Sequence, residues 1–216
     1  LMSCPFLPFA LPDIGQEEID EVVDSMKTGW ITTGPKAARF EKEFATYVGT
    51  KHAFAVNSAT SGLHLALDAI GIERGDKVIT TPYTFTATSE VIRYFDADPI
   101  YCDVDECTMN IDTDQLEGVV QQAIAEFGKR VKAIMPVHMA GQACRMDRIL
   151  EIARKYGLRV VEDAAHSLPT TFDGRMIGTI GDITVFSFYA TKTIATAEGG
   201  MVVTDDDDFA KRLKVM

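Results

Sequence analysis

Short apolar runs alternate with segments of helical periodicity from residue 53 onward, and this alternation restricts the fold more than any other feature. The runs are continuous enough for strands buried on both faces, and the helices between them allow successive strands to lie parallel. The sequence therefore predicts an α/β fold of three layers, α/β/α, with a mostly parallel sheet. Strands are expected at 53–56, 78–81, 99–102, 131–137, 158–161, 183–186 and 201–204, and helices at 63–70, 86–95, 112–127 and 145–156.

Two amphipathic helices are expected before this alternating region. The first should begin at a cap near Asp13, the second should cover about 36–47, and a loop with the only tryptophan, Gly29–Pro35, should join them. We therefore divide the chain into an arm, helix and loop at 1–35 and a larger domain at 36–216. Further expectations are an arm lying on a surface at 1–12, an N-cap at Thr113 and a loop at 164–181.

One lysine, Lys192, stands alone in the segment Ser187–Gly200, which joins the last two expected strands. Its neighbours are small residues and hydroxyls, and the nearest charge in the sequence is Glu198, so the segment is predicted to be packed. Partial desolvation favours the neutral amine, which is the form that a nucleophilic lysine needs. The alternative is a snorkelling lysine whose stem lies on apolar neighbours.

Other chemically capable residues follow the expected strands, where ligands bind in open parallel sheets. Asn57–Gly62 opens a helix with small residues and hydroxyls, which suits an anion, although an ordinary N-cap explains it too. Phe85 could stack on a flat ring or could be a core residue. Asp163 could hold a ligand or cap a helix, and His166 could act with it or be structural.

Together these residues offer an anion-binding helix N-terminus, an aromatic plate, a carboxylate and an amine around one crevice. Pyridoxal phosphate needs this set: phosphate on the helix, ring on the aromatic, ring nitrogen on the carboxylate and aldehyde on the lysine. The sequence therefore predicts pyridoxal 5'-phosphate as cofactor.

Composition excludes several other classes of protein. The 216 residues carry 21 basic and 32 acidic side chains, a net charge of −11, which argues against nucleic-acid binding. The four cysteines lack the spacing of a zinc site, so no metal is expected, and isolated cysteines fit a reducing cytoplasm. The apolar amino end is interrupted by prolines and lacks a basic region, so neither a signal peptide nor a membrane span is predicted.

Five runs resemble the sugar aminotransferases of the DegT/DnrJ/EryC1/StrS family, which are pyridoxal-phosphate enzymes of fold type I. The runs occur in the family's order and span nearly the whole chain. Within the first run, the resemblance implies that Gly29–Pro35 is a loop near the active site. The resemblance implies a homodimer with shared active sites, and transfer of an amino group, usually from glutamate, to a keto group of a nucleotide-linked deoxysugar. The matching runs are Ser25–Phe44, Asn57–Leu67, Thr81–Ala87, Glu162–Ser167 and Phe186–Thr204.

The resemblance also implies individual roles. Lys192 would bind the cofactor's aldehyde and move the proton, Asp163 would hold the ring nitrogen, and Phe85 would stack on the ring where relatives often carry tryptophan. His166, at a position where many relatives have glutamine, would contact the 3-hydroxyl. The phosphate would lie on Thr60, Ser61 and Ser187, with backbone amides from Ala59 onward.

The family's small second domain is missing from the pattern, because the sequence stops in mid-pattern at Met216. We therefore expect the large-domain portion of a longer protein. One alternative is a pyridoxal-phosphate dehydratase or racemase, and the presence of Lys192 argues against the dehydratase. The other alternative is a non-catalytic regulatory relative or an inactive fragment.

Overall fold

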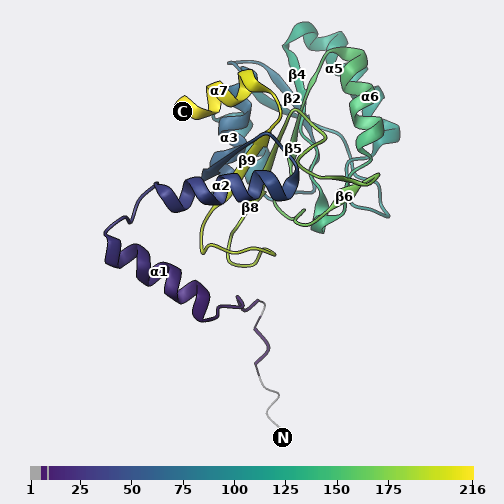
Figure 1. Cartoon of the computed structure of the whole chain (residues 1–216). Coiled ribbons are helices and arrows are strands. Elements are labelled where there is room, and N and C mark those ends of the chain that lie inside the picture. The colour runs from purple at the N-terminus through teal and green to yellow at the C-terminus, as the bar shows by residue number, and fades with distance from the viewer. Residues whose placement is uncertain (1–5, 9) are drawn as a thin grey trace, which may run out of the picture.

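A seven-stranded sheet forms the centre of the computed structural model, which describes residues 6–8 and 10–216 (Figure 1). The strand order is β1-β9-β8-β5-β4-β2-β3. The strands are β1 (His52–Val56), β2 (Lys77–Thr80), β3 (Asp98–Tyr101), β4 (Val131–Ile134), β5 (Arg159–Asp163), β8 (Ile183–Ser187) and β9 (Gly200–Thr204).

The sheet is mostly parallel, as the alternation predicts. Strands β8, β5, β4, β2 and β3 pair parallel in that order, whereas β9 is antiparallel to both β8 and β1. The reversal arises because a loop without a crossover helix joins β8 to β9, and antiparallel neighbours need no such helix. This loop carries Lys192.

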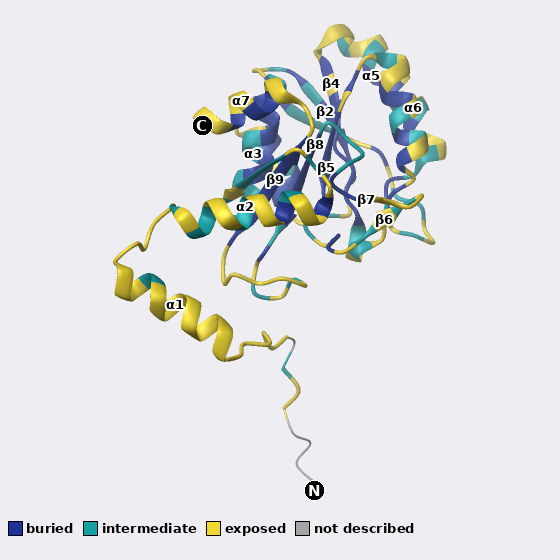
Figure 2. Ribbon diagram, in the orientation of Figure 1, coloured by how far each residue is buried: buried dark blue, intermediate teal, exposed yellow. Residues whose placement is uncertain are grey.

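Helices cover both faces of the sheet, so the three-layer prediction is confirmed. On one face α3 (Ala59–Ile70), α4 (Ala87–Arg93) and α7 (Asp207–Val215) pack in one hydrophobic cluster with strand residues such as Val78 and Val185. On the other, α2 (Pro35–Val48), α5 (Thr113–Phe127) and α6 (Met146–Tyr156) pack with Ile79 and Phe186. The inner strands β5, β8 and β9 are almost wholly buried between these layers, whereas the edge strands β1 and β3 are only partly buried (Figure 2).

Helix α1 (Gln16–Thr28) lies outside these layers and buries no residue (Figures 1 and 2). Lys36 of α2 forms salt bridges with two carboxylates of α1. Its Nζ lies 2.5 Å from an oxygen of Glu21 and 3.0 Å from an oxygen of Asp24. The expected apolar face is present but faces solvent, with 61% of Val22 and 69% of Met26 exposed. In the single chain, α1 is therefore tied to the body by charge and by the chain itself.

The expected surface arm is not seen in its described part, because Phe6 and Leu7 are 90% and 88% exposed. Residues 1–5 and Phe9, and with them Cys4, lie outside the described residues. The other cysteines, Cys102, Cys107 and Cys144, are free thiols. Within the described chain, no helix is both long and apolar enough to cross a membrane.

Several predicted boundaries differ from those in the structure, and in two cases a side-chain hydrogen bond sets the start of a helix. The cap of α1 is Gly15, whose amide donates to Glu18 at 2.7 Å, rather than Asp13. The cap of α5 is Asp112, which accepts from the Asp114 amide at 2.9 Å, rather than Thr113. Strand β4 ends at Ile134, three residues early.

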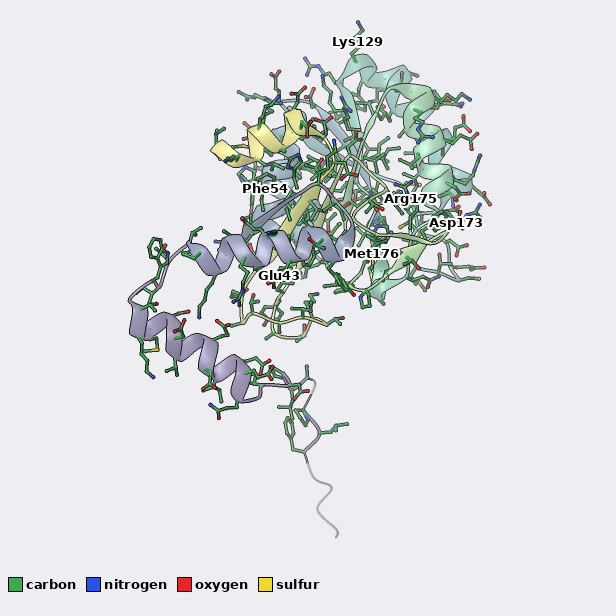
Figure 3. The ribbon with its side chains drawn as sticks, viewed as in Figure 1. Glu43, Phe54, Lys129, Asp173, Arg175 and Met176 are labelled. Atoms are coloured by element: carbon green, nitrogen blue, oxygen red, sulfur yellow. The ribbon has the colours of Figure 1, made fainter. Side chains whose placement is uncertain are left out.

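Two further local expectations also differ from the structure. The predicted loop 164–181 contains a two-stranded hairpin, β6 (Thr171–Phe172) and β7 (Arg175–Met176). Its turn contains Asp173, which is labelled in Figure 3. The φ of Asp173 is 48°. On α2, Tyr47 is 54% exposed and Val48 is buried in its place.

Helix α3 begins at Ala59, four residues before its predicted start, and two glycines let it lie close to the sheet. A Cβ at Gly62 would lie 2.7 Å from Val185. A Cβ at Gly200 would lie 2.8 Å from the Ala59 nitrogen and from the Phe186 carbonyl oxygen. Only glycine therefore allows the first turn of α3 to contact the start of β9.

Replacing Gly200 with alanine should lower the free energy of unfolding by about 1–3 kcal/mol, because backbone atoms must shift to admit the methyl group. Chemical denaturation measures this change. The matched control is Gly118→Ala in α5, where an added Cβ meets nothing within 4 Å. That variant should be more stable by up to about 1 kcal/mol, since alanine favours a helix. Equal stability of the two variants would contradict the close approach.

Candidate active site

A cleft of about 550 Å³ opens at the carboxyl ends of the parallel strands, at the edge where Asp163 ends β5 and Ser187 ends β8. This volume is within the range of small-molecule sites. The cleft brings together seven of the eight residues predicted from the sequence, which come from four separate segments of the chain. They are Ala59, Thr60, Phe85, Asp163, His166, Ser187 and Lys192.

Lys192 is half-buried at this cleft, in the loop between β8 and β9. Burial lowers the pKa of its amine below the usual value, and the nearby Asp163 carboxylate opposes the shift without cancelling it. The loop itself is not packed as predicted, because Thr193 to Glu198 are exposed. The desolvation of Lys192 therefore arises from the cleft rather than from its neighbours in sequence.

Asp163 is 5% exposed, and donors fix both of its oxygens. Its Oδ2 accepts from the Thr88 hydroxyl at 2.7 Å, and its Oδ1 accepts from the Ala165 amide at 3.2 Å. A carboxylate has about four acceptor sites, so capacity remains for a further donor in the cleft. Among the described residues no lysine, arginine or histidine forms an ion pair with it.

The first turn of α3 supplies Ala59 and Thr60 to the cleft, but not Ser61. Ser58 is the N-cap, and its Oγ accepts from the Ser61 amide at 3.1 Å. The Ser61 hydroxyl lies 2.5 Å from Asn57 Oδ1 and 2.8 Å from the Ser58 carbonyl oxygen. The cap of α3 therefore engages the Ser61 hydroxyl, and its contact with the cofactor phosphate stays a prediction.

Phe85 is 78% exposed, which excludes the alternative of a core phenylalanine. Such exposure leaves the side chain free to cover a flat ligand in the cleft. His166 lies exposed at the rim, where partial burial and the charge of Lys192 lower its pKa and Asp163 opposes them. The predicted active-site loop around Trp30 does not line this cleft in the single chain.

A fully buried pair, His138 and Glu162, lies directly behind the site and escaped the sequence analysis. His138 Nε2 is 2.9 Å from a Glu162 oxygen, and its Nδ1 accepts from the Cys144 amide at 3.0 Å. Because Nδ1 must be unprotonated to accept, we assign the neutral ring with its proton on Nε2. The other Glu162 oxygen accepts from Gly181 and Thr184 at 2.7 and 2.8 Å.

This pair joins the ends of β4 and β5, and so supports the backbone that carries Asp163. The His138 amide also donates to the Asp163 carbonyl oxygen at 3.1 Å. A sequence signal existed for Glu162, since a carboxylate inside an apolar strand needs buried donors. No sequence signal identified its partner His138, because the register between β4 and β5 is what brings His138 and Glu162 together.

The chain resembles known proteins over nearly its whole length. The chain is 53% identical over 211 residues to the spore coat polysaccharide biosynthesis protein SpsC of Bacillus subtilis (strain 168), covering 98% of this chain and 52% of that protein. It is 43% identical over 217 residues to GDP-perosamine synthase of Caulobacter vibrioides, covering 100% of this chain and 57% of the relative.

Solved structures show the same likeness. The PLP-form of the putative sugar aminotransferase Spr1654 from Streptococcus pneumoniae superposes with a TM-score of 0.87 at 36% identity. That match covers 97% of this chain and 57% of the other. The chain thus spans about half the length of the relatives it matches.

A family model also covers almost the whole chain. The model of the DegT/DnrJ/EryC1/StrS aminotransferase family matches residues 12–216. The chain belongs to this family.

Proposed function

We propose that the protein containing this chain is a pyridoxal-phosphate-dependent aminotransferase that moves an amino group, from glutamate, to a keto group of a nucleotide-linked deoxysugar. The observation that carries the proposal is the convergence on one cleft of an amine with a lowered pKa, a buried carboxylate, an exposed aromatic ring and a helix N-terminus. The family and the name of its relative GDP-perosamine synthase support the sugar substrate.

The residues present fit the cofactor. Asp163 has acceptor capacity left after its two protein donors, and a carboxylate there would keep the ring nitrogen protonated. The first turn of α3 directs its dipole toward the cleft, with Thr60 and the amide of Ala59 beside it, which suits a phosphate. Ser187 offers a hydroxyl from the end of β8, and the α3 cap does not use it.

Each side chain then has a defined task. Pyridoxal phosphate, when bound, supplies the electron sink for a negative charge on the donor's α-carbon. Lys192 Nζ would hold the cofactor's aldehyde carbon until the amine of the donor displaces it. The freed Nζ would then take the proton from the donor's α-carbon and return it to the cofactor. Phe85 would hold the ring plane, and His166 would donate or accept at the 3-hydroxyl. Lys192 favours this reaction over the dehydratase alternative.

A direct test uses the whole natural polypeptide that contains this chain. With pyridoxal phosphate it should absorb visible light, and borohydride reduction followed by peptide mass spectrometry should place the cofactor on Lys192. Glutamate and a nucleotide-linked keto-sugar should then yield 2-ketoglutarate and an amino sugar. Attachment of the cofactor to another lysine, or no binding of the cofactor, would contradict the proposal. Cofactor binding without amino transfer would favour the regulatory alternative.

The attachment reaction should depend on pH through Lys192. Because burial lowers the pKa of Lys192, its neutral amine should appear at lower pH than the ordinary lysine value implies. The initial rate of attachment, followed by absorbance, should therefore have its midpoint below pH 10.5, the ordinary lysine value. Asp163→Asn should move the midpoint lower still, because the carboxylate favours the ammonium form. A midpoint that rises in this variant would contradict the arrangement.

We also propose a homodimer in the cytoplasm. The exposed apolar face of α1 supports a partner surface, since Ile19, Val22, Val23 and Met26 find no cover in the described part of the chain. Light scattering on the whole polypeptide measures the mass directly.

A further inference from the structure

Thr88 links two parts of the cleft that come from different segments of the chain. Its hydroxyl is fully buried and donates to Asp163 Oδ2 at 2.7 Å. The Thr84 hydroxyl is 2.7 Å from the same Thr88 oxygen. Because Thr88 has one proton and gives it to the carboxylate, Thr84 must donate to Thr88. The three groups therefore form a hydrogen-bond chain with one direction.

The backbone of Thr88 fastens the aromatic residue of the site. Its amide donates to the Phe85 carbonyl oxygen at 3.1 Å, across the turn that opens α4. One residue thus holds Phe85 through its main chain and Asp163 through its side chain. The relative position of ring plate and carboxylate depends on it.

A purely local role would look different. A threonine inside a helix usually returns its hydroxyl to the carbonyl oxygen one turn earlier. The Thr88 hydroxyl instead bonds to a carboxylate 75 positions later in the sequence. Among the described side chains, Thr88 is the hydrogen-bond donor to Asp163, and the Ala165 amide is the second donor. Removal of the hydroxyl would leave Oδ2 without its protein donor, and only the longer bond from the Ala165 amide to Oδ1 would then fix the orientation of the carboxylate.

We propose that Thr88 is a positioning residue that fixes the Asp163 carboxylate in the orientation required by the cofactor's ring nitrogen. The inference rests on the proposed function, and it adds a residue to which that function assigns no role. Thr84 acts behind it, since its proton keeps the Thr88 hydroxyl pointed at Asp163.

The test compares Thr88→Val, which keeps the shape and removes the hydroxyl, with Thr88→Ser, which keeps the hydroxyl, in the whole natural polypeptide. Loss of a hydrogen bond to a charged group should weaken pyridoxal-phosphate binding in Thr88→Val about ten- to hundredfold. Thr88→Ser should stay within about threefold of the wild type. Absorbance titration of the apoprotein measures both, and thermal melting of the apoproteins checks that each is folded.

A second readout responds to orientation and not to packing. NMR of bound cofactor labelled with 15N at the ring nitrogen reports whether that nitrogen carries a proton. The pH at which the proton is lost should fall in Thr88→Val and be restored in Thr88→Ser. Thr88→Ala provides the same comparison if the valine variant does not fold.

The outcomes separate the two proposals. Wild-type protein that binds the cofactor while Thr88→Val matches it in affinity and in 15N titration overturns the positioning role alone. Thr88→Ser that fails as badly as Thr88→Val also overturns it, because the hydroxyl is then not what matters. Wild-type protein that binds no cofactor overturns the proposed function and this inference together.

Discussion

Replacing Lys192 with alanine is expected to abolish covalent retention of pyridoxal phosphate and to slow amino transfer by at least about 10²–10⁴-fold. The lower bound comes from the lost proton transfer, since a positioned general base contributes a factor of this size. Loss of the covalent attachment adds to it. Steady-state formation of 2-ketoglutarate from glutamate measures the rate, and absorbance after gel filtration measures retention.

Two variants control for charge and for fold. Lys192→Arg keeps a cation in the cleft but has no amine that can lose its proton, so it should fail as alanine does. Lys129→Ala removes an exposed lysine at the other end of the molecule and should change neither quantity (Figure 3). Retention in Lys192→Ala equal to that in Lys129→Ala would show that the desolvated lysine is not the attachment point.

The sheet and its two helical layers could be predicted because burial on both faces leaves a periodic record in the sequence. Apolar runs such as 131–137 predict strands regardless of which strands they pair with. Amphipathic helices predict the layers that cover the sheet. The reversed strand β9 could not be predicted, since strand direction depends on the connection and not on composition. The sequence predicted an apolar face on α1 but not its exposure, because periodicity records apolar residues and not what covers them.

The site was predictable where its residues stand at strand ends, because topology alone brings such positions together. This applies to Asp163, Ser187 and the first turn of α3. The position of the Ser61 hydroxyl could not be predicted, because a side-chain cap competes for it within four residues. Thr88 and the buried pair His138–Glu162 escaped because their importance depends on contacts across elements, which no local pattern encodes.

Asparagine at position 163 should lower amino transfer by roughly a hundred- to a thousandfold while leaving the fold intact. The amide can donate to Thr88 through its NH2 group and accept from the Ala165 amide through its oxygen, so both hydrogen bonds survive once the Thr88 hydroxyl reverses. What disappears is the negative charge that would hold the ring nitrogen protonated. The expected loss is that of one preorganised electrostatic group at a reacting centre, and it should appear in kcat for the glutamate half-reaction.

The matched control for this charge is Asp173→Asn in the turn between β6 and β7, outside the cleft (Figure 3). Asparagine tolerates the left-handed backbone of Asp173, whose φ is 48°, so this variant should fold and react like the wild type. Both variants have the same net charge, and a comparison of their kcat values therefore isolates the position of the carboxylate. If Asp163→Asn kept the rate of Asp173→Asn, Asp163 could not be the partner of the ring nitrogen. If Asp163→Asn reacted slowly but bound the cofactor as tightly as the wild type, the charge would act on the reaction itself. A charge that only contributed to cofactor binding would lower the affinity when it was removed.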